Sequence, residues 1–211
     1  MNSAILYTKF EGVIWSIVPV SGCDLLIVDH RILDKKTVLL TYLECDSMKT
    51  KMMSLSLSWW EKLLVATKDQ LNLLKYEDPG DPTKNTLWVL NVNFGSRTQV
   101  DEVLETNEEV IHPYVYEQGT EYHQLVSNFL SMDLPLSCEY LELENKIIIS
   151  YYLRSERGFD RFLLVIDSDG QLQYKVKQGH KMKGFAPGSF FVWNSKLIFV
   201  KDGNEVGISL I

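Results

Sequence analysis

Charged and tyrosine side chains stand at equivalent positions in four apolar segments of this sequence, each of which reads as a strand with a polar end. Mixed charges and tyrosine hydroxyls around one cavity suit a polar ligand or a loop of a partner protein. Arg31 and Arg154 are expected to be exposed, so that alanine at either position changes stability by less than about 1 kcal/mol. The predicted ligand-binding residues are Asp29, His30, Arg31, Tyr76, Glu77, Tyr152, Arg154, Lys201 and Asp202.

Three carboxylates stand at comparable places in the repeated segments, namely Asp29, Glu77 and Glu156. A glycoside hydrolase needs two or three acidic groups that converge on the sugar. These residues therefore keep a carboxylate-dependent enzyme of that class open as an alternative. No residue is assigned a catalytic role.

The segment "YEDPGDPTKN", residues 76–85, separates two apolar runs. Proline fixes φ and aspartate caps its own backbone, so two Asp-Pro pairs are typical of consecutive turns. The alternative is a calcium or magnesium site formed by Glu77, Asp78 and Asp81, although such sites need six or more oxygen ligands. A long, solvated hairpin connection is the favoured interpretation.

Motifs of known catalytic and cofactor sites are absent from the sequence. There is no G-x-S-x-G elbow, phosphate-binding G-x-x-x-x-G-K, H-E-x-x-H or dinucleotide-binding G-x-G-x-x-G. The four histidines lie far apart without the spacing of metal ligands. The sequence predicts neither a cofactor nor a metal site.

Cys23, Cys45 and Cys138 are an odd number of cysteines at wide spacings, which indicates mostly buried thiols rather than disulfides. The N-terminal residues carry neither a basic start nor a long apolar run. No stretch approaches the roughly 20 apolar residues that cross a bilayer. We therefore expect no membrane segment and a cytoplasmic location.

Trp59 and Trp60 are adjacent in the sequence. Neighbouring residues of a strand point to opposite faces, so both cannot enter one core if the segment is extended. One of them is then a candidate for an exposed aromatic platform. The other tryptophans are expected to pack between sheets.

Runs of four to eight β-branched and aromatic residues, bounded by turn residues, predict strands almost throughout. They recur in one order, which gives four units over residues 12–55, 59–105, 138–177 and 189–211, the last lacking a fourth strand. Residues 107–136 form an abbreviated or altered repeat. Two segments resemble helices: 120–132, and 59–74, which splits as easily into two strands.

Four-stranded antiparallel repeats of this length are typical of propeller blades. We predict a single all-β, propeller-like domain over residues 1–211, with four to five blades. Residues near Leu6 are expected to pair with residues near Ile208, supplying the strand that the last unit lacks. The alternative architecture is a β-sandwich or an open barrel.

Residues 24–44 and 59–92 together carry a resemblance to a known group of proteins. The pair "DLLIVDHRILDKKTVLLTYLE" and "WWEKLLVATKDQLNLLKYEDPGDPTKNTLWVLNV" resembles a bacterial domain family of unknown function, of the Bacteroidetes type, with propeller-like repeats. This resemblance implies a bacterial protein and the propeller fold. It implies no reaction.

The formal net charge of −7, from 21 Lys and Arg against 28 Asp and Glu, disfavours binding to nucleic acid. The sequence predicts a binding or interaction module whose partner is a protein or a small polar ligand. A structural or regulatory subunit is a further alternative, and a large exposed apolar patch would be its mark.

Overall fold

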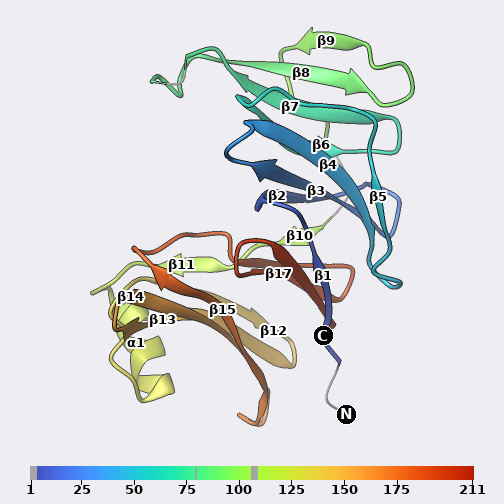
Figure 1. The fold of residues 1–211 in the computed structure, drawn as a ribbon. Helices are drawn as coiled ribbons and strands as arrows, with labels where there is room; N and C mark the ends of the chain where they lie inside the picture. Colours follow the sequence, from blue (N-terminus) through green and yellow to red (C-terminus); the bar gives the residue numbers. More distant parts are fainter. Residues whose placement is uncertain (1–3, 79, 106–108) are drawn as a thin grey trace. The chain divides into compact units, whose positions relative to one another are not determined.

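The computed structural model describes residues 4–78, 80–105 and 109–211. Figure 1 shows a chain built almost entirely of antiparallel strands. The chain divides into two compact units, each considered by itself. One unit spans Thr8–Glu109, and the other joins the start of the chain up to Tyr7 to Val110–Ile211.

The unit Thr8–Glu109 contains two four-stranded sheets whose strands follow chain order. They match the first two predicted repeats strand for strand, and residues 59–74 contain two strands rather than a helix. The first sheet consists of β2 (Val13–Pro19), β3 (Leu25–Ile32), β4 (Thr37–Glu44) and β5 (Thr50–Met52). The second consists of β6 (Glu61–Ala66), β7 (Gln70–Tyr76), β8 (Asn85–Asn91) and β9 (Arg97–Val100).

Alternate side chains of these two sheets form one hydrophobic core. Ile27 and Leu40 of the first sheet are fully buried in the same cluster as Leu71 and Leu73 of the second. Burial of one such side chain stabilises the fold by about 1.5–3 kcal/mol. The two sheets also meet directly, through an isolated parallel bridge between Val20, which follows β2, and Ala66, the last residue of β6.

The second unit contains two five-stranded sheets. One has the order β11-β12-β13-β14-β15, and the other has the order β1-β18-β17-β16-β10. The first comprises β11 (Tyr114–Tyr116), β12 (Cys138–Leu143), β13 (Lys146–Ser155), β14 (Gly158–Asp167) and β15 (Leu172–Met182). The second comprises β1 (Leu6–Lys9), β10 (Val110–Ile111), β16 (Phe190–Trp193), β17 (Lys196–Lys201) and β18 (Glu205–Leu210).

The predicted pairing of the chain ends is confirmed. β1, which contains Leu6, lies beside β18, which contains Ile208. The Tyr7 ring also packs edge-on against Phe199, with ring centroids 6.1 Å apart. The N-terminal strand thus covers an edge of β18 that would otherwise be open.

The altered repeat contributes two short strands and one helix. β10 and β11 extend one sheet each, and α1 (Glu121–Leu130) follows them. The helix begins where the Thr120 hydroxyl accepts a hydrogen bond from the His123 backbone N–H, 3.4 Å away. Val126 of α1 is buried among side chains of β13 and β14, so the helix covers one face of that sheet (Figure 1). The helix predicted over residues 120–132 is confirmed.

The all-β class is therefore confirmed, with α1 as the only helix among the residues described. The four sheets are all open. A propeller arrangement of these sheets, and a single domain over residues 1–211, remain predictions.

The three cysteines keep their thiols and form no disulfide with one another. Cys45 and Cys138 are buried, whereas Cys23 is half-buried. Burial, with the charge of Glu139 as a smaller cause, raises the pKa of the Cys138 thiol to about 11. The thiolate of Cys138, which is the reactive form, is therefore scarce in the folded protein below that pH.

Thiol labelling of the native protein at pH 8 should be fast at Cys23 only. Cys45 and Cys138 should react after denaturation, because they are enclosed and because folding disfavours the Cys138 thiolate. Raising the pH towards 11 should speed labelling of Cys138. Mass spectrometry of labelled peptides distinguishes the sites, and rapid native labelling of all three at pH 8 would contradict the expectation.

Candidate functional site

Arg31, near the end of β3, is buried and hydrogen-bonded rather than exposed. Its relative exposure is 3%. The guanidinium donates to both carboxylate oxygens of Asp29, over 3.3 and 3.1 Å, and to the backbone carbonyls of Trp59 at 2.7 Å and Glu61 at 2.6 Å. The prediction of an exposed Arg31 is wrong, because its side chain ties β3 to the start of the neighbouring sheet.

Asp29 is the buried counter-ion of Arg31, since the two residues are two apart on one face of β3. Asp29 has no exposed surface. Burial raises the pKa of its carboxyl group, while the hydrogen bonds and charge of Arg31 work in the opposite direction. His30, on the opposite face, is bound by the Glu11 carbonyl at 2.8 Å and the Thr41 hydroxyl at 2.9 Å. Asp29 and His30 are therefore structural residues rather than direct ligand contacts.

Aromatic rings surround Arg31 and leave a cavity beside it, which we name the tryptophan pocket. The guanidinium carbon lies 4.5 Å from the ring centre of Trp15 and 5.4 Å from that of Trp59. Trp15 and Trp60 are exposed to 57% and 47%. The cavity has a volume of about 270 Å³ and is lined by Trp15, Arg31, Trp59, Trp60, Glu61, Lys62, Tyr76, Asp78 and Pro82.

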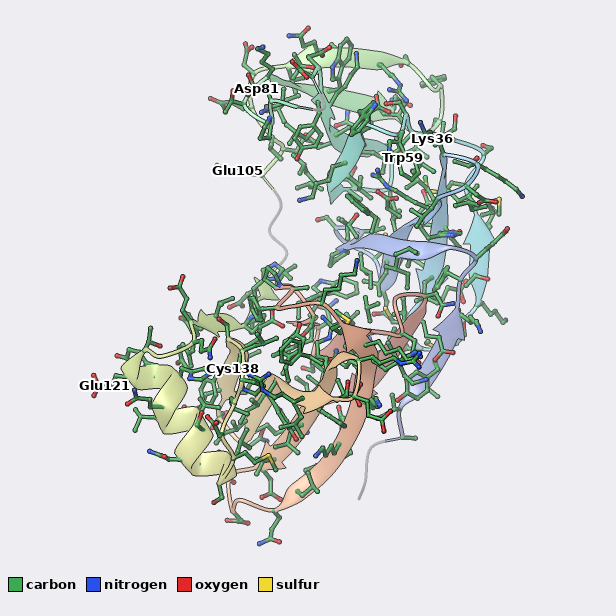
Figure 2. All side chains as sticks on the ribbon, turned by 60° about the vertical axis from the view of Figure 1, so that its left-hand side comes forward. Lys36, Trp59, Asp81, Glu105, Glu121 and Cys138 are labelled. Atoms are coloured by element: carbon green, nitrogen blue, oxygen red, sulfur yellow. The ribbon has the colours of Figure 1, made fainter. Side chains whose placement is uncertain are left out.

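Local backbone features place these rings. Between Ile14 and Ser16 the register of β2 against β3 shifts by one residue, so Trp15 stands at a bulge beside Arg31. Trp59 and Trp60 form the turn before β6. Trp60 is exposed and Trp59 is half-buried, but the two residues form a turn, so the extended segment on which the expected aromatic platform depended is not observed; the platform remains a prediction. Trp59 is labelled in Figure 2.

The loop between β7 and β8 borders this pocket and is built from its own hydrogen bonds. The Asp78 carboxylate accepts from the Gly80 N–H at 2.9 Å. The Asp81 carboxylate accepts from the Thr83 N–H at 3.1 Å and from its hydroxyl at 2.6 Å, bonds that lower the pKa of Asp81. Lys84 pairs with both aspartates, at 3.7 and 3.4 Å. Figure 2 labels Asp81 in this loop. These contacts support the interpretation as consecutive turns.

Tyr76 and Glu77, the remaining predicted site residues of this unit, differ in their surroundings. Tyr76 ends β7 and lines the tryptophan pocket. The Glu77 carboxylate accepts from the Thr86 hydroxyl at 2.8 Å and pairs with Lys75 at 3.6 Å. Glu77 is exposed and does not line the pocket.

The other four predicted site residues belong to the second unit. Tyr152 is buried, and its hydroxyl is 3.1 Å from the Ala186 N–H, from which it accepts a hydrogen bond. Arg154 is exposed, as expected, with its guanidinium 5.7 Å from the Phe159 ring centre. Lys201 pairs with Glu205 at 2.7 Å and with Asp202 at 3.5 Å. Convergence of all nine residues on one channel remains a prediction.

A wider hollow of about 810 Å³ lies on the polar side of α1, between Gln118 and Leu134. His123 borders it, but its Nε2 atom is bound to the Leu136 carbonyl at 2.9 Å. Among the described residues, no group of three or more His, Cys, Asp or Glu could hold a metal ion. The tryptophan pocket is therefore the better candidate site, because aromatic and polar groups converge there.

No protein-family model matches this chain, and a search of curated proteins gave no significant match. The resemblance to a bacterial family with propeller-like repeats remains a hypothesis. Within the described part of the chain, no helix has the length and apolar character needed to span a membrane.

Proposed function

We propose that this protein is a non-catalytic binding module and that its tryptophan pocket holds a small, neutral ligand with a flat apolar face and a polar edge. A sugar ring has this character. The observation that carries the proposal is the exposure of Trp15 and Trp60 at a cavity whose floor is held by the buried Arg31. Aromatic faces left open to solvent beside a fixed polar group are typical of ligand sites.

Charge favours a neutral ligand over a cation or a polyanion. The Arg31 guanidinium already lies over the rings of Trp15 and Trp59, so the ring faces that it covers are not open to a cationic ligand. The net charge of −7 opposes binding of nucleic acids. Lys62 and Asp78 at the pocket supply one donor and one acceptor for hydroxyl groups.

The burial and contacts of the acidic residues favour ligand binding over glycoside hydrolysis. Asp29 has no exposed surface and is held by Arg31, so it is not placed to protonate a bound sugar. Glu77 is engaged by Thr86 and Lys75 outside the pocket. Of the carboxylates that line the pocket, Glu61 is buried and held by the Arg97 guanidinium and the Ser58 N–H, and Asp78 accepts from the Gly80 N–H and pairs with Lys84. We therefore do not propose the hydrolase alternative.

We also propose that the four sheets are blades of one propeller-like domain. Three observations support this arrangement: the two four-stranded sheets of the unit Thr8–Glu109, the parallel bridge between Val20, just after β2, and Ala66 of β6, and the completion of the last sheet by β1. Thiols at all three cysteines support the cytoplasm as the proposed compartment.

Trp60→Ala should weaken binding of a neutral sugar at least about fivefold, because stacking on an indole contributes around 1 kcal/mol beyond the buried area. A panel of neutral mono- and disaccharides is screened by thermal shift and by quenching of tryptophan fluorescence, and the best ligand is titrated by calorimetry. Trp15→Ala should have a similar effect.

The matched control is Phe94→Ala, since Phe94 is an aromatic residue of the same unit, 83% exposed and outside the pocket. It should leave the affinity unchanged. The proposal fails if no saccharide binds, or if Phe94→Ala and Trp60→Ala weaken binding equally.

A further inference from the structure

Helix α1 presents two apolar stripes, of which one covers its own sheet and the other faces solvent. Val126 and Leu130 pack on the sheet. Tyr122, Leu125 and Phe129 remain exposed, to 62%, 56% and 52% respectively. Their spacing of three and four residues places them on one side of the helix. Such a stripe is unusual on a surface helix, whose outer side is ordinarily polar.

This exposed stripe forms one wall of a groove, which we name the tyrosine groove. The groove has a volume of about 310 Å³, enough for apolar side chains of a bound segment. It runs where α1 meets β11, β12 and the start of β13. Its lining comprises Tyr116, Tyr122, Leu125, Val126, Phe129, Tyr140, Glu142 and Ile147.

The other wall of the tyrosine groove contains Tyr116 of β11 and Tyr140 of β12, and these rings form a stack with Tyr122 of α1. Tyr116 lies between Tyr122, 5.2 Å away by ring centroids, and Tyr140, 5.6 Å away, with interplanar angles of 24° and 22°. The Tyr140 hydroxyl donates to the Glu142 carboxylate over 3.0 Å. Burial and Glu142 raise the pKa of Tyr140 to about 12, so the phenol keeps its proton. The wall is preorganised, which lowers the entropic cost of binding.

Acidic side chains outnumber basic ones around the groove. Residues 110–145 include no Lys or Arg but six acidic residues, of which Glu139 is buried. Lys146 begins β13 beside the lining residue Ile147, but adjacent residues of a strand point to opposite faces of the sheet, so its side chain is not on the groove face. The Lys175 ammonium group lies 4.6 Å from the Phe162 ring centre. Lys175 is on β15, two strands from β13, the nearest strand that lines the groove, which corresponds to about 10 Å.

Four exposed acidic residues form what we name the acidic rim: Glu142 lines the groove, Glu117 and Glu121 are adjacent in sequence to its lining residues Tyr116 and Tyr122, and Glu144 follows Glu142 by two positions. Asp133 is also exposed but lines the hollow on the polar side of α1.

We infer that the tyrosine groove binds a basic amphipathic helical segment of a partner protein. Apolar side chains of the segment enter the groove beside Leu125 and Phe129, and its Lys or Arg residues face the acidic rim. Recognition of an amphipathic helix in an apolar groove uses this combination of anchors and complementary charge. A second copy of the chain is disfavoured as the occupant, since a symmetric contact would bring two acidic rims together.

The test uses a fluorescein-labelled helical peptide of 15 residues, with leucines along one face and lysines elsewhere, in fluorescence anisotropy with the full chain. Saturable binding that weakens as salt rises is expected. Two control peptides separate the contribution of charge from that of the apolar face. One carries Glu in place of Lys, and the other has the same composition with leucines distributed around the helix. Both should bind at least about tenfold more weakly.

The variant Leu125→Ala with Phe129→Ala should weaken peptide binding about tenfold, since central apolar anchors dominate such interfaces. Both residues are exposed, and alanine favours the helix, so folding should be retained. Leu210→Ala, at a leucine of the same unit that is 63% exposed on β18, is the matched control. Glu142→Gln should weaken binding and Glu156→Gln should not.

Absence of binding by the basic peptide, or equal binding by the Glu-containing peptide, would overturn the inference. Equal loss in the Leu125 and Leu210 variants would also overturn it. Dimerisation of the full chain that the Leu125→Ala and Phe129→Ala changes abolish in sedimentation would assign the groove to a second copy instead. The groove and the tryptophan pocket lie in different units, so each proposal can fail without the other.

Discussion

Arg31→Ala is expected to lower the free energy of unfolding by about 3–5 kcal/mol, because it leaves the Asp29 carboxylate buried without its cation. Asp29 has no exposed surface, and its two oxygens are held by the Arg31 guanidinium. The same change removes two bonds to backbone carbonyls, of Trp59 and Glu61, and so loosens the start of β6. Urea denaturation at pH 7, followed by tryptophan fluorescence, measures the effect.

The free energy of unfolding that is lost in Arg31→Ala should depend on pH. Without Arg31, burial raises the pKa of Asp29 further above its ordinary value near 4. A carboxyl group whose folded pKa is raised favours the folded state when protonated and opposes it when ionised. The stability lost should therefore be largest at neutral pH and should shrink as the pH falls towards the ordinary value.

Arg154→Ala is the matched control, because this arginine is exposed and makes only a ring contact with Phe159 among the interactions described for it. A change within about 0.5 kcal/mol is expected there. The double variant Asp29→Ala with Arg31→Ala should be less destabilised than the two single variants together, since it leaves no lone buried charge. A loss below 1 kcal/mol in Arg31→Ala would show that the ion pair is not structural.

The order of the strands could be predicted because each is a run of β-branched or aromatic residues bounded by turn residues, as in β12 to β15. The altered repeat gave no such signal. β10 has two residues and β11 has three, too few for a period of two to be recognised. Their places in the sheets depend on pairing with β16 and β12, which are distant in the chain.

The candidate site could be predicted in part. Tyr76 lines the tryptophan pocket because it ends β7, a feature of local sequence. Arg31 was expected there too, but its burial depends on carbonyls of Trp59 and Glu61, which belong to another sheet. Trp15 was expected in the core, and the bulge in β2 that turns it towards Arg31 has no marker residue such as glycine. Long-range contacts therefore determine the burial of Arg31, and a bulge determines the position of Trp15.

The tyrosine groove was also beyond sequence reasoning. The segment 120–132 was identified as a helix from its apolar periodicity, and that periodicity includes both the covered and the exposed stripe. Only the packing of Val126 on the sheet determines which stripe remains outside. The acidic character of residues 110–145 can be read directly, yet it acquires meaning only beside an exposed apolar surface.

Deletion of residues 1–9 should lower the melting temperature by about 6–12 °C, which corresponds to roughly 3 kcal/mol for a chain of this size. The deletion removes β1, and with it the backbone hydrogen bonds that cover the edge of β18, each contributing about 1 kcal/mol net. It also removes the Tyr7 ring from Phe199 and from the Lys201 ammonium group, 5.4 Å from the ring centre. Differential scanning calorimetry measures the shift, and an exposed edge should also promote aggregation.

A rescue variant tests whether the fall in melting temperature comes from losing the paired strand β1 or from shortening the N-terminus. Residues 4–9 are moved behind Ile211 through a flexible glycine-serine linker, so that β18 is followed by the strand that pairs with it. An antiparallel neighbour can be reached by a short hairpin connection, and the moved strand should restore most of the lost melting temperature. The control carries the same six residues in scrambled order with proline at the second position, which cannot donate to the ladder. An unchanged melting curve after the deletion, or equal recovery by both rescue variants, would show that β1 contributes no specific pairing to the stability of the last sheet.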